Sequence, residues 1–558
     1  MEIQFLGGAT TVTGSQYLLT TERARVLIDC GMFQGSPNES IRNRIPFAFD
    51  PTELDAVLLT HAHLDHCGLL PLLVKDGYTG PIHATPGTIE LATLVLLDSG
   101  KLHEEFAKRE ARWEKRHPER VAADDRKEED AYQAALALAA SEDPQREPAV
   151  VAPAVVAQGS DPALPASASP DTEHVPTTIE PVASATWPRD PEADLRAQPP
   201  HLVIDLDQPL YTARDAELTL GHFVPIRYSA ESEVAPGILA TFVDAGHILG
   251  SAIIRLRIVE HEGGDQRIIV FSGDLGRPGT PILRDPTAMP EADYVLVEST
   301  YGGREHEPED EAIRVLAETI RMVAAAGGVL LVPSFAIGRT QEVVWELDRL
   351  IERGEIPLLP LYLDSPMASK ASDVYRRHPE NYDEETAKLL RDGASPLDYP
   401  NQIITNDLKQ SQAIEHAPRP YMIVASNGML TGGRVVGHLR NLIDDPKATI
   451  LFVGYQGEGT LGAHLQAGAT EVRLDGQIRR VRCQVRSISG FSAHADEGEL
   501  LDWLRHFSAG KRPGDPGYPR RVFLVHGDPE AQIAMEPKVR ELGFATHVPH
   551  WHERVTLD

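Results

Sequence analysis

Short apolar runs, each ending at a polar or glycine-containing loop, recur along the chain. They include residues 26–28 and 56–59 near the N-terminus, and then 238–243, 253–259 and 267–271. Runs of this length that are bounded by turn residues are typical of buried strands. The first part of the chain, up to about residue 300, is therefore predicted to be rich in strands that end in polar loops.

After residue 300 the pattern changes to strands that alternate with helices. Helices are predicted at 311–325 and 340–353, and strands at 328–333, 358–363 and 422–425. Strand, glycine-rich loop and helix in succession are typical of a parallel α/β sheet. The loops of such a sheet gather at the carboxyl ends of its strands, where ligands bind.

Several residues in these loops are candidate contacts for phosphate groups. Backbone N–H groups at a glycine-rich loop and arginine side chains both suit phosphate oxygens. The candidates are Ser334, Arg339, Arg434, Gly457 and Thr460. No Walker loop is present, because the GxxxxGK[ST] spacing is absent.

Residues 105–207 differ in composition from both flanking parts. The segment 104–142 is charge-rich and helical in pattern, with a break at Pro118, and 144–200 is rich in Pro, Ala and Ser. Such a segment cannot bury enough apolar surface to offset the entropy lost on ordering. We expect a partly disordered insertion that acts as a passive linker, with a tether that binds a protein partner as the less favoured alternative.

Composition excludes several classes of protein. The chain has 558 residues and 42% apolar content, and no apolar run is long enough for a membrane helix. The N-terminus has no basic segment with a cleavage site, and the three cysteines are far apart, which excludes a disulfide framework. We expect a cytoplasmic protein with no membrane partner. The net charge of −30 argues against loose, charge-driven binding of nucleic acid, so a phosphate-bearing substrate would have to be held locally.

The densest chemical motif follows the predicted strand 56–59. It contains His61, His63, Asp65 and His66 within one short loop. Imidazoles and carboxylates are natural ligands for Zn²⁺. His61 and His63 can point one way and Asp65 and His66 another, which suits two metals side by side. A solvated, histidine-rich turn is the ordinary alternative, but later segments supply further ligands.

Those further ligands lie at the ends of other predicted strands. His247 follows the strand 238–243, Asp274 follows 267–271, and His526 follows 521–525, each beside a glycine. A carboxylate has two oxygens, so Asp274 can bridge two metals. Asp29, at the end of the strand 26–28, is predicted to support the metal ligands through hydrogen bonds.

Together these motifs resemble a known family. The order Asp29, His61-x-His63-x-Asp65-His66, His247 and Asp274 resembles the metallo-β-lactamase fold. Glu298 in Glu-Ser-Thr-Tyr-Gly, His494 in Phe-Ser-Ala-His and His526 in Val-His-Gly resemble the three further motifs of the β-CASP nucleases. The nearest members are the bacterial and archaeal relatives of the eukaryotic pre-mRNA 3′-end-processing endonuclease. The resemblance covers nearly the whole chain outside the insertion.

The resemblance implies an α/β protein: a four-layer αβ/βα sandwich with an inserted α/β β-CASP cap domain. On this basis residues 1–300 form the first part of the metallo-β-lactamase domain, 301–480 the cap, and 481–558 the last part, with the active site in the cleft between the two domains. It also implies two Zn²⁺ ions that activate a bridging hydroxide. His61, His63 and His247 hold one ion, Asp65, His66 and His526 hold the other, and Asp274 bridges. The implied catalytic residues are Asp65, Glu298 and His494, with His494 as general acid positioned by Glu298.

The implied substrate is single-stranded RNA, cleaved in RNA processing or decay. His526 favours RNA, because the DNA-directed branch of the family carries an apolar residue there. Endonucleolytic cleavage is expected, with a 5′-exonuclease mode and cleavage of single-stranded DNA left open, and a homodimer is a further hypothesis.

Two other classes of protein remain alternatives. A dizinc hydrolase of thioesters or lactones would share the first five motifs, but the cap, Arg339, Arg434 and His494 argue against it. A catalytically inactive scaffold subunit would be expected to lose metal ligands, and all seven are present.

Overall fold

A computed structural model describes residues 1–35, 37–139, 208–260, 264–454, 456–457, 459–474 and 476–558. The segment 144–200, for which we predict disorder, lies outside the described residues. None of the described helices combines the length and apolar character that crossing a membrane requires.

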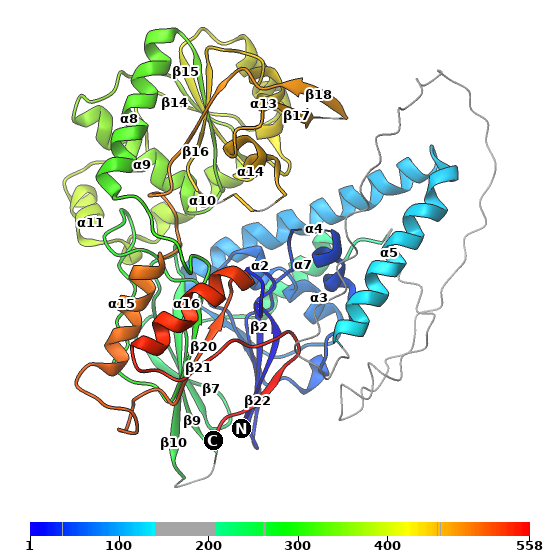
Figure 1. Cartoon of the computed structure of the whole chain (residues 1–558), viewed down its shortest axis with the longest axis vertical. Coiled ribbons are helices and arrows are strands. Elements are labelled where there is room, and N and C mark those ends of the chain that lie inside the picture. Colours follow the sequence, from blue (N-terminus) through cyan, green and yellow to red (C-terminus); the bar gives the residue numbers. More distant parts are fainter. Residues whose placement is uncertain (36, 140–207, 261–263, 455, 458, 475) are drawn as a thin grey trace.

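Two β-sheets pack face to face, and helices cover the outer face of each (Figure 1). Along strand β3 (Arg25–Ile28), Val26 and Ile28 pack between the sheets, while Leu27 packs outward under the helices. The neighbouring strand β4 (Ala56–Leu58) alternates in the same way. These strands are apolar on both faces because both faces are covered. The expected four-layer αβ/βα sandwich is confirmed.

Each sheet of the sandwich has seven strands within the described parts of the chain. The first sheet contains, in spatial order, β22 (Arg554–Thr556), β1 (Glu2–Gly7), β2 (Gln16–Thr20), β3, β4, β5 (Ile82–Ala84) and β6 (Phe223–Pro225). The second contains β21 (Thr546–His547), β20 (Arg521–Val525), β11 (Tyr294–Glu298), β10 (Gln266–Phe271), β9 (Ala252–Val259), β8 (Ile238–Asp244) and β7 (Glu231–Ala235).

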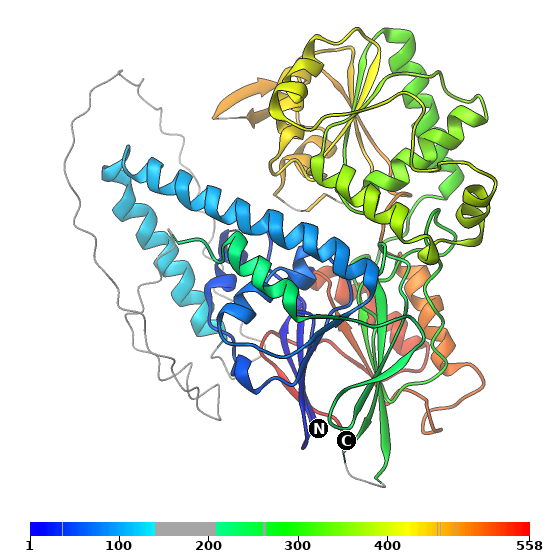
Figure 2. The same ribbon diagram turned by 180° about the vertical axis from the view of Figure 1, so that it is seen from behind.

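Two groups of helices form the outer layers. Over the first sheet lie α1 (Pro37–Ser40), α2 (Leu64–Cys67), α3 (Leu70–Lys75), α4 (Pro86–Glu114) and α7 (Ala213–Thr219), and α5 (Pro118–Ala139) packs beside α1. Over the second lie α15 (Glu497–Ser508) and α16 (Pro529–Glu541). The long helices α4 and α5 extend away from the sandwich (Figure 2), and they are separated near Pro118, as predicted.

The cap is inserted between two neighbouring parallel strands of the second sheet. Strand β11 ends at Glu298, the chain builds the cap, and β20 then pairs with β11 so that Glu298 lies beside Val525. This register brings His526 next to Glu298 at the end of β11, although His526 and Glu298 are more than two hundred positions apart in sequence. One strand pair therefore sets both the exit of the chain into the cap and the position of a predicted metal ligand.

The cap has a six-stranded sheet, counted over the described residues, with helices on both faces. Its strands are β14 (Gln402–Ile404), β13 (Leu361–Leu363), β15 (Tyr421–Ala425), β12 (Val329–Pro333), β16 (Ala448–Phe452) and β19 (Gln484–Ser487), joined by parallel pairing, with a hairpin of β17 (Glu471–Leu474) and β18 (Gln477–Arg480) beside them. Its helices are α8 (Glu309–Ala326), α9 (Arg339–Glu352), α10 (Pro366–Arg377), α11 (Glu384–Arg391), α12 (Leu408–Ala413), α13 (Arg434–Leu442) and α14 (Leu461–Gln466). The cap sheet extends to Ser487, past the predicted domain boundary at residue 480.

Candidate metal centre

The predicted metal ligands lie just after four strands of the two sheets, and two of them, Asp65 and His66, lie on the short helix α2 and not in a loop as predicted. His61, His63, Asp65 and His66 follow β4 in the first sheet, whereas His247, Asp274 and His526 follow β8, β10 and β20 in the second. The backbone N–H of Ala252 donates to the carbonyl of Thr60 across the sheets at 2.9 Å. The structure therefore brings all seven residues to one edge of the sandwich, where they form two groups.

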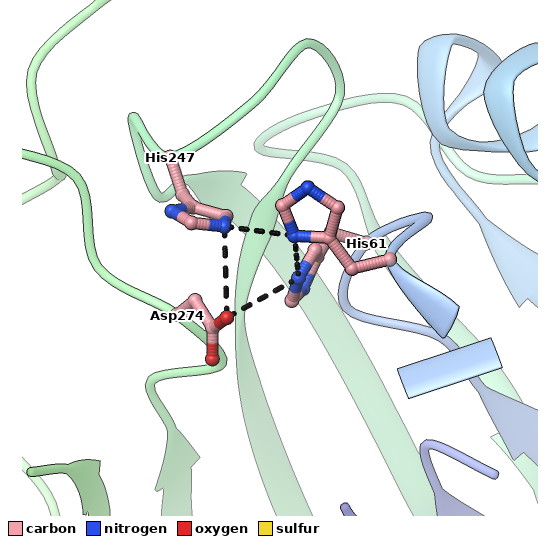
Figure 3. A group of neighbouring side chains, drawn as sticks. His61, His247 and Asp274 are labelled. Atoms are coloured by element: carbon pink, nitrogen blue, oxygen red, sulfur yellow. Dashed lines mark hydrogen bonds and ion pairs between the residues drawn. The ribbon is translucent and has the colours of Figure 1, made fainter. Parts of the chain in front are cut away.

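The first group consists of His61, His63, His247 and Asp274, whose ligand atoms lie within 4.8 Å of one another. Nδ1 of His63 lies 3.2 Å from Nε2 of His61 and 3.1 Å from Nε2 of His247. Oδ2 of Asp274 lies 3.4 Å from Nε2 of His61 and 3.5 Å from Nε2 of His247. Figure 3 shows His61, His247 and Asp274 pointing toward one another from three different loops.

The second group consists of Asp65, His66 and His526. Nε2 of His66 lies 3.3 Å from Nε2 of His526, which lies 3.7 Å from Oδ2 of Asp65. The other oxygen of Asp274, Oδ1, lies 3.2 Å from Nε2 of His66. One carboxylate therefore faces the first group with Oδ2 and the second with Oδ1.

Hydrogen bonds outside the two groups orient the imidazoles. Asp29 accepts from Nδ1 of His66 at 2.8 Å, from the N–H of Thr60 at 2.7 Å and from its hydroxyl at 2.8 Å. The hydroxyl of Thr300 lies 3.1 Å from Nδ1 of His526. Partners of this kind fix the tautomer and the ring orientation of histidine ligands. Thr60 and Thr300 were not predicted to have a role, although each adjoins a functional motif at a strand end.

Two residues at the centre adopt the left-handed backbone region. The φ angle is 57° at Asp29 and 48° at His526. Residues other than glycine are uncommon in this region, and such conformations cluster at functional sites. The surrounding strands therefore hold both residues in conformations that an isolated loop would rarely adopt.

Burial sets the protonation states of the imidazoles in the first group. Burial lowers the pKa of His61 to about 3 and that of His63 to about 4, and it lowers the pKa of His247 well below its usual range. Burial opposes ionisation of Asp274, but the nearby imidazoles outweigh it and hold the pKa of this carboxyl well below its usual range. Neutral imidazoles and an ionised carboxylate are the forms that bind metals.

His66 differs from the histidines of the first group in its protonation. Burial lowers its pKa, but the carboxylates of Asp274 and Asp29 outweigh burial and raise the pKa well above its usual range. Metal ligation through Nε2 of His66 therefore requires loss of a proton from this ring.

The spacing of these side chains fits divalent metal ions. The nitrogens of three imidazole pairs face each other at 3.1–3.3 Å. Oδ1 of Asp274 is buried and accepts no hydrogen bond of regular geometry among the described residues, although Nε2 of His66 lies 3.2 Å from it. Imidazole and carboxylate groups converging in this way are the ligand set that Zn²⁺ takes in catalytic sites.

Glu298 and His494 form a pair beside the bridging carboxylate. Nδ1 of His494 lies 3.1 and 3.2 Å from the two carboxylate oxygens of Glu298, and Nε2 lies 3.9 Å from Oδ2 of Asp274. Glu298 is fully buried, and it also accepts from the N–H of Leu275 at 2.7 Å. Burial opposes the charged imidazole, but the carboxylates of Glu298 and Asp274 raise the pKa of His494 to about 9. These two carboxylates therefore favour the protonated form of His494.

The two arginines predicted to contact phosphate are bound to carboxylates of the cap. Arg339 is 4% exposed and pairs with Glu342, and Nη1 of Arg434 lies 2.7 Å from the buried Asp364. Gly338, just before Arg339, lines a cavity of about 20 Å³ between cap and base together with His247. The loop of Arg339 is thus close to the metal centre, but its guanidinium is engaged within the cap, and phosphate binding stays a prediction.

The other three phosphate candidates also serve local structure. Ser334 is fully buried and receives a hydrogen bond from the hydroxyl of Thr340 at 3.2 Å. Thr460 caps helix α14 by accepting from the N–H of Ala463 at 3.2 Å, and its own hydroxyl donates to the carbonyl of Gly457 at 2.7 Å. For these residues too, phosphate binding stays a prediction.

Comparison with known proteins finds three family models along the chain. The metallo-β-lactamase superfamily matches residues 9–130, the Beta-Casp domain matches 340–465, and the Zn-dependent metallo-hydrolase RNA specificity domain matches 478–549. Ribonuclease TTHA0252 of Thermus thermophilus is 34% identical over 535 residues, which cover 96% of this chain and 95% of that protein. Transcription termination factor FttA is 29% identical in Methanosarcina mazei, with 97% of this chain and 69% of that protein covered, and 28% identical in Methanocaldococcus jannaschii, with 98% and 70% covered.

Proposed function

The chain belongs to the β-CASP family of metallo-β-lactamase-fold hydrolases, and from this membership we propose that it is a zinc-dependent ribonuclease that cuts single-stranded RNA internally. One observation carries the proposal. Asp274 faces a ligand group with each of its two oxygens and lies 3.9 Å from His494. Two metal positions and a proton donor therefore meet at one carboxylate.

We propose two Zn²⁺ ions for the centre, because the ligand residues form two groups. His61, His63 and His247 would hold one, Asp65, His66 and His526 would hold the other, and Asp274 would contact both. Zinc in such a site lowers the pKa of water and neutralises charge on phosphoryl oxygens. This donor set and the name of the C-terminal family model support zinc as the metal.

His494 acts as the general acid. A water-derived oxygen bonds to the phosphorus, the bond from phosphorus to the 3′-oxygen breaks, and His494 gives the proton of Nε2 to that leaving oxygen. The products carry a 5′-phosphate and a 3′-hydroxyl. Glu298 holds Nδ1 of His494, so that Nε2 points at the reaction, and it stabilises the charged ring.

RNA is the substrate that the similarities favour. The relatives are named as a ribonuclease and a transcription termination factor, and the C-terminal family model is named for RNA specificity. A histidine at position 526 fits the RNA-directed members. A cytoplasmic location, a homodimer and a protein partner for the insertion stay predictions.

The test combines metal analysis with cleavage of a labelled single-stranded RNA. We expect two zinc ions per wild-type chain, together with cleavage that Asp65→Ala and His494→Ala reduce by at least about 100-fold, the lower range for a general acid. His506→Ala, at an exposed histidine on α15, is the matched control and is expected to cut at the wild-type rate. Thioester turnover without cleavage of any RNA would refute the proposal.

Circular RNA tests the internal mode of cleavage. A circle has no end, so its linearisation requires an endonuclease. We expect the wild type to cut the circle and a linear RNA with a blocked 5′ end at similar rates. Cleavage of only those linear RNAs that have an accessible 5′ end would assign an exonuclease mode instead.

A further inference from the structure

The loop that follows Glu298 forms hydrogen bonds with the segment that contains His494. The N–H of Gly303 donates to Glu497 at 2.7 Å, and the N–H of Glu497 donates back to the carbonyl of Arg304 at 3.1 Å. Glu307 accepts from the N–H of Ser489 at 2.6 Å. These contacts lie before and after His494 in sequence, so the loop 301–307 holds both ends of the segment.

His306 is the residue of this loop that reaches His494 itself. Its Nε2 lies 3.1 Å from the carbonyl oxygen of His494, and its backbone N–H donates to Asp496 at 3.1 Å. The His306 ring packs edge-on against Tyr301, with ring centroids 4.3 Å apart. Because a carbonyl only accepts, Nε2 of His306 carries the proton. Burial and then Arg277 lower the pKa of His306 to about 4, so the ring is a neutral donor.

The peptide at His494 is fixed by contacts at three consecutive residues. The carbonyl of Ala493 accepts from Nδ1 of His247 at 3.0 Å, the carbonyl of His494 accepts from His306, and the N–H of Ala495 donates to the carbonyl of Leu275 at 2.8 Å. Two of the three contacts come from loops of the metal centre. The contact of His306 comes from the loop that leads into the cap.

We propose that His306 is a positioning residue for the general acid: its Nε2–H fixes the carbonyl of His494 and thereby aims the His494 side chain at the leaving 3′-oxygen. This inference rests on the proposed ribonuclease function. His306 touches neither the ligand groups nor Glu298 through any hydrogen bond found among the described residues. Its loss is therefore expected to affect proton delivery and to leave metal binding intact.

The test uses two single-stranded RNAs that differ at one linkage. One has an ordinary linkage, and in the other sulfur replaces the bridging 3′-oxygen at the cleavage site. A thiolate leaves without a proton, so a defect in proton delivery disappears on the sulfur substrate, whereas a defect in metal binding or folding does not. The variants are His306→Phe, which keeps a ring without a donor, and His306→Gln, whose Nε2–H can still reach the carbonyl.

We expect His306→Phe to lower kcat on the ordinary linkage by about fivefold to tenfold, the equivalent of one hydrogen bond of roughly 1 kcal/mol. KM and zinc content are expected to stay at wild-type values, and the thermal midpoint is expected to fall only by what the loss of one hydrogen bond of roughly 1 kcal/mol implies. On the sulfur linkage the defect should shrink to within about twofold, and His306→Gln should recover most of the rate on the ordinary linkage. If His306→Phe folds poorly, His306→Asn replaces it, because its amide is too short to reach the carbonyl.

Equal defects of His306→Phe on both linkages, an unchanged kcat, or no recovery in His306→Gln would each overturn the positioning role. His494→Ala separates this failure from failure of the proposed function. If sulfur rescues His494→Ala but not His306→Phe, only the positioning role is wrong. If sulfur rescues neither variant, or the wild type cuts no RNA, the proposed mechanism is wrong as well.

Discussion

Glu346 is a buried carboxyl group with no hydrogen-bond partner for either oxygen among the described residues. It lies in the middle of α9 and is 1% exposed. Burial, and then the carboxylates of Glu342 and Glu309, raise the pKa of Glu346 to about 8. A carboxylate in such a place is costly, because neither water nor a donor compensates for its charge. We predict that Glu346 makes the cap less stable as pH rises and that Glu346→Gln removes this effect.

The pKa of Glu346 fixes the sign and size of the effect. The unfolded chain releases this proton near the ordinary value of 4.5, whereas the folded chain keeps it to about 8. The contribution of Glu346 to stability is therefore greatest below pH 4.5 and is lost as pH rises through 8. One pKa unit corresponds to about 1.4 kcal/mol, so roughly 2 kcal/mol is lost between pH 6 and pH 8, and little more above pH 9.

Urea unfolding at pH 6, 7 and 8 tests this prediction, with tryptophan fluorescence as the probe because Trp345 is the neighbouring residue on α9. The amide of Glu346→Gln does not titrate. The free energy of unfolding of the variant minus that of the wild type should therefore increase by about 2 kcal/mol from pH 6 to pH 8. Glu541→Gln, at an exposed glutamate at the end of α16, should follow the wild type at every pH. A constant difference between Glu346→Gln and the wild type would refute the reasoning, whatever its absolute size.

Three further predictions concern the metal centre. Asp274→Asn should lose most zinc from both positions and abolish RNA cleavage, and two zinc ions per chain by mass spectrometry would contradict the bridging position. Asp29→Asn replaces the carboxylate that accepts from Nδ1 of His66 with a neutral amide and should lower zinc affinity by about 10- to 100-fold, measured by competition with a chelating dye. Thr300→Val should act on His526 in the same way but more weakly, because a hydroxyl is a weaker partner than a carboxylate; an effect larger than that of Asp29→Asn would contradict this order.

The apolar pattern predicted the central strands of the sandwich but missed the edge strands β7 and β22. Strand β4 is apolar on both faces and ends at the metal motif, so periodicity and chemistry agreed there. Strand β7 (Glu231–Ala235) was not predicted, because three of its five residues are polar and it lies exposed at the edge of its sheet. Strand β22 (Arg554–Thr556) has one apolar residue and is defined by its pairing with β1, which local sequence does not reveal.

In the candidate site too, features set by neighbouring residues could be predicted, whereas contacts between residues far apart in sequence could not. The seven proposed ligands could be found because they gather in one motif or follow strand ends beside glycine. The two carboxylates that pair with Arg339 and Arg434 differ in how far the sequence reveals them. Glu342 lies one helical turn from Arg339 and could have been predicted as its partner, since residues three apart on a helix are neighbours. Asp364 is 70 residues from Arg434, and only the folded cap brings the two together.

The peptide at Ala493 and His494 couples the two halves of the proposed reaction. His247, a proposed ligand of the first metal, donates to the carbonyl of Ala493, and the next residue is the proposed acid. A displacement of this peptide would therefore move the acid relative to the metals, and a displacement of His247 would move the acid with it. The loop 301–307, which leads into the cap, also holds this peptide through His306. The position of the loop that enters the cap and the orientation of the proposed proton donor are thus linked by direct hydrogen bonds.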